Sequence, residues 1–590
     1  MTVIAGAYCI DPDGEVPKTL RDGFRTNLRT VKDGLGHWST FDRKRVFLIK
    51  WDSGAFNEAA WAVSVDESLS TLIGDPLLTS SGERLTRDRQ LIQLVGSDGK
   101  LRADELAQTR GAFSIARFDA KSQTLSLATD MLGLRPVYYT LQSGVFIFAS
   151  ALRVLESMIG VQKKLSMTGM VELNVFAFPL AERTPYEGIC VLRECETLTV
   201  TEAGTELSVY YDWAAVTSTP DQAATSAEAL FAEFQEAIRI RGEGDRKTYA
   251  FLSGGMDSRA IVGCLLMGGL RVEALNFSPD ASQDQAYARS FAEAAGLQCQ
   301  LHCLTRNDDP NFSLLAFDAK TKLEKSARIA VDRPAFIWSG DGGSVGLGHV
   351  YMDEIMLDHA EKGDINAAVN HFLATNRLTL PAKVLSRDAA RELPEIVFTN
   401  ALAEVHRYPR ADLGRRLYFF LLFNDQRRHL FKHFESIDKH GLEFLLPFYD
   451  VKFLKMVADT PSRWGVLHKL YALWFEHLPA YARSTPWQTY PGHVACPVAG
   501  DKSLSYQWAS REQPYQVSFR SRVPQARTLL REAFDPGLSH IFSRARICLV
   551  AFMHLTGVGE YGYILKVLQR FRDRGAYVKP TQGQNTGELG

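Results

Sequence analysis

A chain of 590 residues is too long for one hydrophobic core, because domains usually contain about 100 to 200 residues. Its 67 lysines and arginines nearly balance its 68 aspartates and glutamates, which excludes a bulk positive field that would attract nucleic acid. The chain has no run of about 18 uncharged apolar residues, and its first residues lack the pattern of a signal peptide. We therefore expect a cytoplasmic protein of at least two domains that binds neither nucleic acid nor membranes.

Short apolar or alternating segments, separated by turn residues, dominate the first 200 residues. Examples are RVFLIKW at 45–51, GAFSIARFDA at 111–120 and GVFIFAS at 144–150. Strands at this density, with few long helical patterns between them, predict a sheet-rich domain. We place this domain at residues 1–210.

The pattern changes at about residue 226. SAEALFAEFQEAIRIR at 226–241 repeats apolar residues at helical spacing, and predicted strands and helices then alternate up to about residue 304. This order predicts a parallel sheet with helices on its faces. Long helical patterns follow beyond about residue 350, within a second domain at 225–575. The tail at 576–590 has little to bury, and we expect it to be disordered.

The segment KTYAFLSGGMDSRAIVGCLL, at 247–266, joins an apolar strand to an apolar helix through a turn of small residues. Free N–H groups at a helix N-terminus attract anions, glycines permit close approach, and serines add hydroxyl donors. We therefore predict a phosphate or pyrophosphate site in this turn. A carboxylate beside phosphate would repel it, so we expect Mg²⁺ to bridge the two, with Asp257 as its ligand. The alternative is that the glycines only form a tight turn and Asp257 only complements the helix dipole.

The turn S-G-G-x-D-S lacks the lysine of a P-loop and resembles that of the ATP pyrophosphatase (PP-loop) group, which holds the pyrophosphate of ATP. Three further segments are similar to asparagine synthetase segments: GAFSIARFDAKSQTLSLATDMLGLRPVYYT at 111–140, FIWSGDGGSVGLGHVY at 336–351 and GLEFLLPFYDVKFLKMVADTP at 441–461. They occur in the order found in that family. The chain is thus identified as a member of the asparagine synthetase-like superfamily, whose relatives include β-lactam synthetase and lasso-peptide cyclase.

The resemblance implies a fold and a set of ligands. The expected fold is an N-terminal Ntn-hydrolase-like αββα sandwich, followed by a parallel-sheet PP-loop domain with a helical C-terminal part. The expected cofactors are ATP and Mg²⁺, and the products of ATP are AMP and pyrophosphate. Asp341 takes the position of the family's base, a glutamate, and it can still accept a proton from an amine. The residues expected to bind ATP or its pyrophosphate are Ser253, Gly254, Gly255, Asp257, Ser258, Ser339 and Gly340.

Two departures concern the glutaminase half. Glutamine-using members have a cysteine at the second position, where this chain has Thr2. An N-terminal threonine can act as a nucleophile with its own amine as base. However, the family's Asn-Gly-Glu glutamine-binding motif is replaced by LIGDPLL at 72–78. We therefore expect a degenerate glutaminase site and no glutamine hydrolysis in this chain.

Two departures concern the synthetase half. Ser344 replaces the family's second Mg²⁺ aspartate, which leaves Asp257, with Asp341 as a further candidate, to hold the metal. The family's phosphate-stabilising lysine has no counterpart in ARSTPWQTYPGHVACP at 482–497. Arg483 and Lys502 are candidate substitutes, and the alternative is that this loop only covers the site.

Two other positions are candidates for ligand binding. Arg427 and Arg428 lie in a basic segment at 423–440, and each is a candidate for binding an acidic substrate or pyrophosphate. The alternative for this segment is a solvated or cleft-facing basic helix. Asp284 follows the second parallel strand, where ligands gather at the ends of strands, although a helix N-cap would explain it equally well.

These observations predict an ATP-dependent synthetase that activates a carboxylate as an acyl-adenylate and joins it to ammonia or an amine. One alternative is a lasso-peptide or other lactam cyclase, whose partners would be a precursor peptide and a protease. A second alternative is a catalytically degenerate nucleotide-binding scaffold. A homodimer is a further expectation for any of the three.

Overall fold

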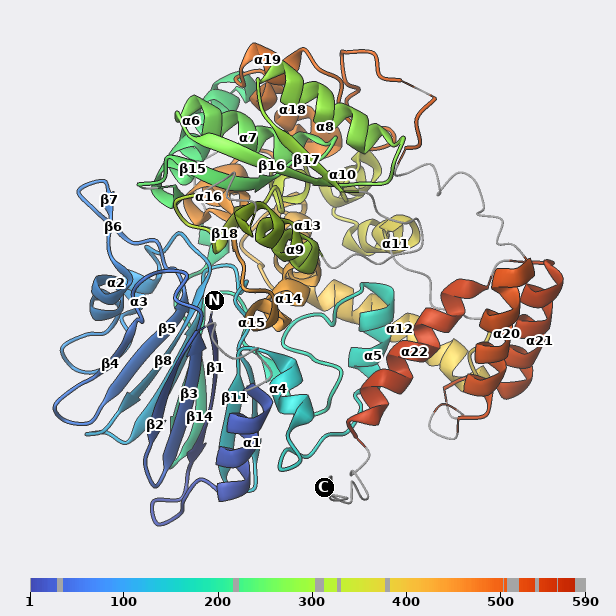
Figure 1. Ribbon diagram of the computed structural model, residues 1–590. Coiled ribbons are helices and arrows are strands. Elements are labelled where there is room, and N and C mark those ends of the chain that lie inside the picture. Colours follow the sequence, from blue (N-terminus) through green and yellow to red (C-terminus); the bar gives the residue numbers. More distant parts are fainter. Residues whose placement is uncertain are drawn as a thin grey trace.

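The computed structural model describes residues 2–28, 36–215, 222–242, 244–302, 312–325, 331–376, 383–501, 503–506, 519–535, 538, 541–559 and 561–578 (Figure 1). The side chains of 299–302, 312, 425–429, 432 and 438 are not described. Within the described ranges, no helix is both long enough and apolar enough to cross a membrane.

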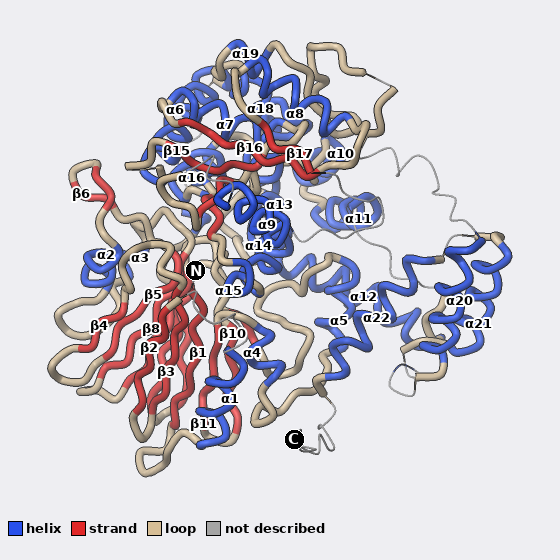
Figure 2. The backbone as a smooth tube through the Cα atoms, viewed as in Figure 1, coloured by secondary structure: helices blue, strands red, loops and turns tan. Residues whose placement is uncertain are grey.

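Two six-stranded antiparallel sheets form the N-terminal part of the chain (Figure 2). The first sheet contains, in spatial order, β12 (Cys190–Val191), β10 (Tyr138–Gln142), β11 (Val145–Ala149), β1 (Thr2–Cys9), β3 (Val46–Asp52) and β2 (His37–Asp42). The second contains β14 (Gly204–Val209), β13 (Glu196–Thr201), β9 (Thr124–Thr129), β8 (Phe113–Asp119), β5 (Leu69–Gly74) and β4 (Trp61–Val63). A short hairpin, β6 (Thr79–Ser80) and β7 (Glu83–Arg84), follows β5.

The two antiparallel sheets face each other. Side chains such as Ile4 and Leu48 from the first sheet pack against Phe118 and Leu127 from the second, and all four are almost fully buried. Helices cover the outer faces: α1 (Lys18–Leu28) and α4 (Leu152–Ser157) lie on the first sheet, and α2 (Arg87–Leu94) and α3 (Ala103–Leu106) lie on the second. The expected αββα sandwich is therefore confirmed.

A five-stranded parallel sheet forms the centre of the remaining chain. Its order is β17 (Cys299–His302), β16 (Arg271–Phe277), β15 (Lys247–Phe251), β18 (Phe336–Trp338) and β19 (Glu443–Leu445). The helices α6 (Ala223–Arg241), α7 (Met256–Met267) and α8 (Gln283–Ala294) alternate with the first strands. The chain leaves β15 toward β16 and later returns on the other side of β15 to form β18. The strand order therefore reverses between β15 and β18, a point at which α/β sheets commonly bind ligands.

Helices account for most of the remaining chain. One of the long helical patterns predicted beyond about residue 350, at 413–434, is interrupted. A π-helical turn, η3 (Leu421–Asp425), separates α13 (Leu413–Phe420) from α14 (Gln426–Glu435). The lobe in orange and red at the right of Figure 1 contains α20 (Phe519–Ala533), α21 (Arg544–Thr556) and α22 (Gly562–Ala576). The other helical elements are α5 (Met167–Val175), η1 (Trp213–Ala215), α9 (Phe312–Lys325), η2 (Gly343–Leu347), α10 (Glu354–Glu361), α11 (Ile365–Asn376), α12 (Arg387–Val405), α15 (Ile437–His440), η4 (Pro447–Tyr449), α16 (Val451–Asp459), α17 (Ser462–Gly465), η5 (Val466–His468), α18 (Lys469–Phe475) and α19 (Ala480–Arg483). Of the predicted tail, residues 579–590 lie outside the described part.

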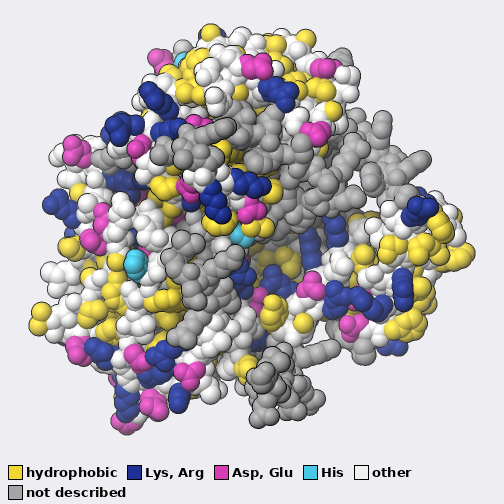
Figure 3. All heavy atoms as spheres, in the orientation of Figure 1, with side chains coloured by type: hydrophobic (Ala, Val, Ile, Leu, Met, Phe, Trp, Pro, Cys, Tyr) yellow, Lys and Arg dark blue, Asp and Glu magenta, His cyan; other side chains and the backbone are white. Residues whose placement is uncertain are grey.

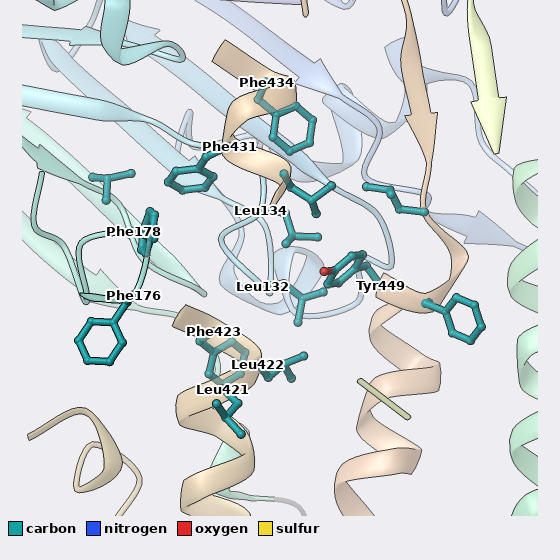
Figure 4. Packing of buried hydrophobic residues seen from close by; sticks show 14 of the residues in the cluster. Leu132, Leu134, Phe176, Phe178, Leu421, Leu422, Phe423, Phe431, Phe434 and Tyr449 are labelled. Carbon is teal, nitrogen blue, oxygen red and sulfur yellow. The ribbon is translucent and has the colours of Figure 1, made fainter. Parts of the chain in front are cut away.

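One hydrophobic core runs from the sandwich into the helices around the parallel sheet. Figure 4 shows Leu132, Leu134, Phe176 and Phe178 beside Leu421, Leu422, Phe423, Phe431, Phe434 and Tyr449. The rings of Phe178 and Phe431 meet edge to face, with their centroids 5.1 Å apart. The sandwich and the parallel sheet are therefore held in one packed arrangement rather than joined by a linker alone.

Buried ion pairs cross the same boundary. Arg135 Nη2 donates to both carboxylate oxygens of Glu443, at 2.8 and 3.0 Å. The carboxylate of Asp450 accepts from Arg110 at 2.8–3.2 Å and from Arg241 at 2.8 Å, and Asp450 also caps α16. Burial alone would raise the pKa of Asp450, but these two arginines hold it below its usual value.

Candidate active site

Two loops meet where the strand order of the parallel sheet reverses. β15 pairs with β18 through Ala250 and Trp338, so the segments that follow these strands emerge side by side. The first segment, 253–258, leads into α7, and the second, 339–344, leads into η2. Gly340 sits directly over the start of α7, since a Cβ added to it would lie 2.7 Å from the Ser258 nitrogen. The two loops therefore form one site.

The first loop is held by its own side chains. The Ser258 hydroxyl accepts from the Ser253 N–H at 2.8 Å and lies 2.9 Å from the Ser253 hydroxyl. The Gly255 N–H donates to the Ser253 hydroxyl at 3.2 Å. α7 begins at Met256, and the N–H groups of its first turn have no carbonyl of their own helix to bind. They provide donors and a positive dipole end for an anion.

Asp257 lies in that first turn, and its carboxylate is heavily hydrogen-bonded. Ser344 donates to it through its N–H at 3.1 Å and through its hydroxyl at 2.9 and 3.1 Å, and the Tyr471 hydroxyl donates at 2.7 Å. Burial of the carboxylate raises its pKa to about 6; these hydrogen bonds work against that rise, and the nearby charge of Asp341 adds to it. The carboxylate is thus neutralised easily unless a cation is bound.

A divalent cation fits this position. Mg²⁺ is commonly held by one or two carboxylates together with substrate phosphates and water. Asp257 supplies one carboxylate beside the anion donors of α7, and Asp341 is close enough to raise its pKa. Among the described residues, no group of three or more histidine, cysteine, aspartate or glutamate side chains is arranged to hold a metal alone. A cation here would therefore depend on ligands from the phosphates.

Asp341 is oriented by its neighbour. The Ser339 hydroxyl donates to Asp341 Oδ2 at 2.7 Å, and Ser339 itself is fixed because its N–H donates to the Leu445 carbonyl at 3.0 Å. Gly342, which follows, has φ of +97° and lies against the ring of Tyr449, so a side chain would be excluded there. Asp341 remains partly exposed on the same loop as Ser344.

Asp284 takes part in the architecture of the loop. The N-cap of α8 is Ser282, and Asp284 lies in the first turn, where its carboxylate accepts from the Gly254 N–H at 2.8 Å. A Cβ added to Gly254 would lie 2.7 Å from the Asp284 Cα. Burial raises the pKa of Asp284, and its hydrogen bonds oppose that rise. Asp284 is therefore beside the candidate site and supports its first loop.

The other predicted residues lie elsewhere. Arg483 donates to the Leu478 carbonyl at 2.9 Å and to Glu476 at 3.2 Å, so its described contacts hold it at the end of α19 and not at the loop. Lys502 lies outside the described residues, as do the side chains of Arg427 and Arg428.

One described residue of the basic segment, His433, is buried and does not face solvent. The His433 side chain is 5% exposed, and its ring stacks on Phe444 with centroids 3.6 Å apart. Its Nδ1 lies 3.0 Å from the Ser313 hydroxyl. Burial lowers the pKa of His433. A neutral imidazole can take part in this stacking on Phe444. The many charged residues of the segment do not predict such an apolar contact.

Two residues at the site were missed by the sequence analysis. Tyr471, on α18, reaches Asp257 from 214 positions along the chain. Gln488 donates its backbone N–H to the Gly254 carbonyl at 2.8 Å, and its side chain is 7% exposed. Both polar atoms of that side chain are buried without a hydrogen-bond partner in the described structure. Such groups are normally satisfied by a ligand or by water, and no local sequence pattern identifies them.

The segment 72–78 is predicted to stand in place of the family's glutamine-binding motif. Its polar groups form hydrogen bonds with other residues of the chain. Asp75 Oδ1 accepts from the Leu77 N–H and from Gln90 Nε2, both at 3.1 Å, and Asp75 Oδ2 pairs with Arg84. Arg87 donates to the Gly74 carbonyl at 2.9 Å. These groups are therefore already paired within the chain.

Thr2 is the first residue of β1 and faces Asp52 across the strand pair. It is 1% exposed, and its hydroxyl has no hydrogen-bond partner in the described structure. Nearby, Lys50 Nζ donates to the Leu72 carbonyl at 3.0 Å and lies 3.4 Å from Asp52. Burial lowers the pKa of Lys50 to about 7, although the negative charge of Asp52 acts to raise it. Thr2 thus lies within a packed interior.

Two parts of the chain match known protein families. Residues 91–211 match a family described as "Glutamine amidotransferase domain", and residues 229–313 match one described as "Asparagine synthase". The first match begins after the segment 72–78. The second contains the loop 253–258 but ends before Asp341.

Individual relatives agree with these matches. "Asparagine synthetase [glutamine-hydrolyzing] 3" of Bacillus subtilis (strain 168) is 28% identical over 191 residues, which are 31% of this chain and 30% of that protein. "Putative asparagine synthetase [glutamine-hydrolyzing] 2" of Methanocaldococcus jannaschii is 28% identical over 173 residues, which are 28% of this chain and 33% of that protein. The chain thus spans about a third of the length of these relatives.

Among solved structures, glutamine phosphoribosylpyrophosphate amidotransferase from B. subtilis aligns with 58% of this chain and 77% of its own, at 11% identity and a TM-score of 0.24. The two family matches follow one another in the order expected from the sequence, and the second includes the loop that begins α7. These matches support an asparagine synthetase-like superfamily for the chain.

Proposed function

We propose that this chain is an ATP-dependent ligase that forms a C–N bond by activating a carboxylate as an acyl-adenylate. The observation that carries the proposal is the pairing of an anion-binding helix N-terminus with a carboxylate. The first turn of α7 offers unpaired N–H groups, and Asp257 lies among them next to Ser344. This combination suits a nucleotide phosphate with a bridging cation better than it suits a bare anion.

The proposed reaction has two steps. A carboxylate oxygen of the substrate attacks the α-phosphorus of ATP, the bond from that phosphorus to the pyrophosphate oxygen breaks, and pyrophosphate leaves. An amine then attacks the acyl carbon, the bond to the AMP oxygen breaks, and AMP leaves with the electron pair. The amine loses one proton, which Asp341 accepts. The 253–258 loop holds the pyrophosphate group of ATP while the carboxylate attacks.

Asp257 and the phosphates would hold Mg²⁺, which offsets the negative charge that accumulates on the leaving pyrophosphate. Ser344 and Tyr471 position the Asp257 carboxylate through hydrogen bonds at 2.7–3.1 Å. Gln488 is proposed to bind the nucleotide or the acyl group, because its backbone N–H contacts the Gly254 carbonyl and neither polar atom of its buried carboxamide has a hydrogen-bond partner in the described structure.

We further propose that the nitrogen does not come from glutamine hydrolysed by this chain. In the segment 72–78, the Asp75 carboxylate and the Gly74 carbonyl are already paired with arginines and Gln90. The cavity beside Gly74 and Arg135 has a volume of about 50 Å³, which suffices for a few water molecules. The amine is therefore ammonia or a second substrate.

The proposal is tested by following nucleotides and glutamate together. The full chain is incubated with Mg²⁺-ATP, a panel of carboxylic acids and either ammonium or glutamine. We expect AMP and pyrophosphate in equal amounts with at least one acid and ammonium, and no glutamate from glutamine. Asp257→Asn is expected to lose AMP formation, whereas Asp388→Asn, an exposed change on α12 with an 82% exposed side chain, is expected to keep it. Glutamate release from glutamine alone would refute the second part of the proposal.

A nucleotide-binding scaffold is the second candidate. It is favoured by the hydrogen bonds of Ser344 and Tyr471, which already occupy both carboxylate oxygens of Asp257. The same experiment separates the two, because a scaffold would bind ATP but would release no AMP with any acid.

A further inference from the structure

The helical lobe of α20, α21 and α22 carries an unusual share of exposed aromatic side chains. Phe519, Phe534 and Phe552 are each 64% exposed. Among the described residues, these are the only phenylalanines that rank with the large exposed hydrophobic side chains. Figure 3 shows hydrophobic side chains gathered with lysine and arginine side chains on this lobe. Contiguous exposed apolar surface of this kind usually marks an interaction site.

The apolar residues of α20 lie along one face. Phe519, Val523 and Leu530 stand at positions i, i+4 and i+11 of α20, Phe534 follows directly after the helix at i+15, and all four are exposed. The buried side of the helix is formed by Ala526, Leu529 and Ala533, which lie on an adjoining arc. At 1.5 Å per residue the exposed stripe is about 22 Å long, which matches about four turns of a partner helix.

A row of arginines runs beside this stripe. Arg520, Arg527 and Arg531 follow Phe519 at i+1, i+8 and i+12, and all three are exposed. In the described structure, Arg520 and Arg527 make no hydrogen bond or ion pair. Arg531 donates to Glu532 at 3.1 Å, but its side chain remains 69% exposed. The guanidinium groups are thus available to carboxylates from outside the chain.

The whole lobe has the same charge bias. Residues 519–578 contain nine arginines and one lysine but four aspartates and glutamates, although the full chain is almost neutral. The buried acid Glu532 is neutralised by Arg531 and Arg572. A lobe that is both basic and apolar is complementary to a surface that is both acidic and apolar.

We propose that the α20 face, defined as Phe519, Arg520, Val523, Arg527, Leu530 and Phe534, binds an acidic amphipathic helical segment of a partner polypeptide. The partner's apolar side chains would cover the stripe and its carboxylates would meet the arginine row. Exposed phenylalanine and arginine with little lysine is the composition of a protein interface. The stripe is one helix face wide and about 22 Å long, which are dimensions that suit the binding of another helix.

The test uses the full chain and three labelled synthetic peptides of 18 residues, followed by fluorescence anisotropy. One is an amphipathic helix with leucines on one face and glutamates on the other, the second carries lysines in place of the glutamates, and the third is a scrambled acidic sequence. We expect the first peptide to bind at least tenfold more tightly than the other two, and to weaken as salt is raised. Thermal melts establish that each protein variant remains folded.

Two double variants and a control locate the site. Arg520→Glu with Arg527→Glu, and Phe519→Ser with Phe534→Ser, are each expected to weaken the acidic peptide at least tenfold. Arg391→Glu with Arg410→Glu changes two side chains that are 77% exposed elsewhere and is expected to change nothing. Equal binding of all three peptides, or no loss in the variants, would overturn the proposal. It would also be overturned if the face instead bound vesicles of phosphatidylserine and phosphatidylcholine, or mediated self-association seen by sedimentation, without binding the acidic peptide.

Discussion

Ser344 donates both its hydroxyl and its backbone N–H to the carboxylate of Asp257, at 2.9–3.1 Å. The family resemblance predicts a second metal-binding aspartate at this position. In this chain the position holds Ser344, which instead donates hydrogen bonds to Asp257. The interaction favours the ionised form of Asp257, which burial disfavours. Ser344 therefore helps to keep Asp257 ionised, which is the state that the proposed cation site would require.

Replacing Ser344 with alanine should raise the pKa of Asp257. The variant loses the hydroxyl donor, and a hydrogen bond of about 1 kcal/mol corresponds to roughly 0.7 pH unit. The acid limb of the pH profile of kcat/KM for ATP should move to higher pH by about that amount. Ser344→Thr retains a hydroxyl and should restore the original profile. An unchanged profile in the alanine variant would mean that Ser344 does not control this carboxylate.

The activity of the unmodified chain should also fall in acid. The pKa of Asp257 is raised to about 6, so the carboxylate that would hold the cation forms as pH rises through that value and is lost as pH falls through it. We expect kcat/KM for ATP to decrease about tenfold for each pH unit below that point. The measurement is a pH series with buffers of constant ionic strength. A profile that stays flat down to pH 5 would exclude Asp257 as a required anion.

Asp450→Asn should destabilise the contact between the sandwich and the parallel sheet. The change removes the counter-charge of the buried Arg241 guanidinium and leaves Arg110 paired with Glu233 alone among the described ion pairs; breaking a buried pair typically costs about 3–5 kcal/mol. The lowered pKa of Asp450 means that its stabilisation is present above the pKa of the unfolded carboxyl and is lost as pH falls through the folded value. Urea unfolding at neutral pH measures the difference. An Asn variant as stable as the exposed control Asp388→Asn would contradict this account.

Two adjacent glycines should respond differently to alanine. A Cβ at Gly254 would lie 2.7 Å from the Asp284 Cα, which is backbone and cannot move aside, so Gly254→Ala should cost about 1–3 kcal/mol and weaken ATP binding. At Gly255 the nearest atom would be the Ser253 hydroxyl at 3.5 Å, so Gly255→Ala should cost about 1 kcal/mol or less. Unfolding and ATP titration of the two variants measure both effects. Equal losses would show that the loop contacts do not set the difference.

Much of the fold follows from local patterns in the sequence. The apolar segments at 45–51, 111–120 and 144–150 became β3, β8 and β11, because alternation and β-branched content bury well in a two-sheet sandwich. The strand, turn and helix at 247–266 were also recognisable, because small residues at that turn serve a local backbone geometry. The break in the helical pattern at η3 was not predicted, since its apolar spacing fits an uninterrupted α-helix equally well.

The composition of the site depended on contacts between distant residues. Tyr471 and Gln488 reach the loop only once α18 packs against α6 and α19 packs against α7, so no spacing rule connects them to Asp257 or Gly254. Ser344 was interpreted from the sequence as the loss of a metal ligand, and only the geometry revealed its hydrogen bonds to Asp257. The partners of Arg483, which are Glu476 and the Leu478 carbonyl, could not be predicted from the local pattern either.

The most direct measurement is the identity of the nucleotide products when the full chain turns over ATP with a substrate carboxylate labelled with ¹⁸O. Attack of the carboxylate on the α-phosphorus, followed by displacement by an amine, predicts AMP that carries one ¹⁸O atom, together with an equal amount of unlabelled pyrophosphate. Both should disappear in Asp257→Asn. Formation of ADP and labelled phosphate, or of unlabelled AMP, would contradict acyl-adenylate formation at this site.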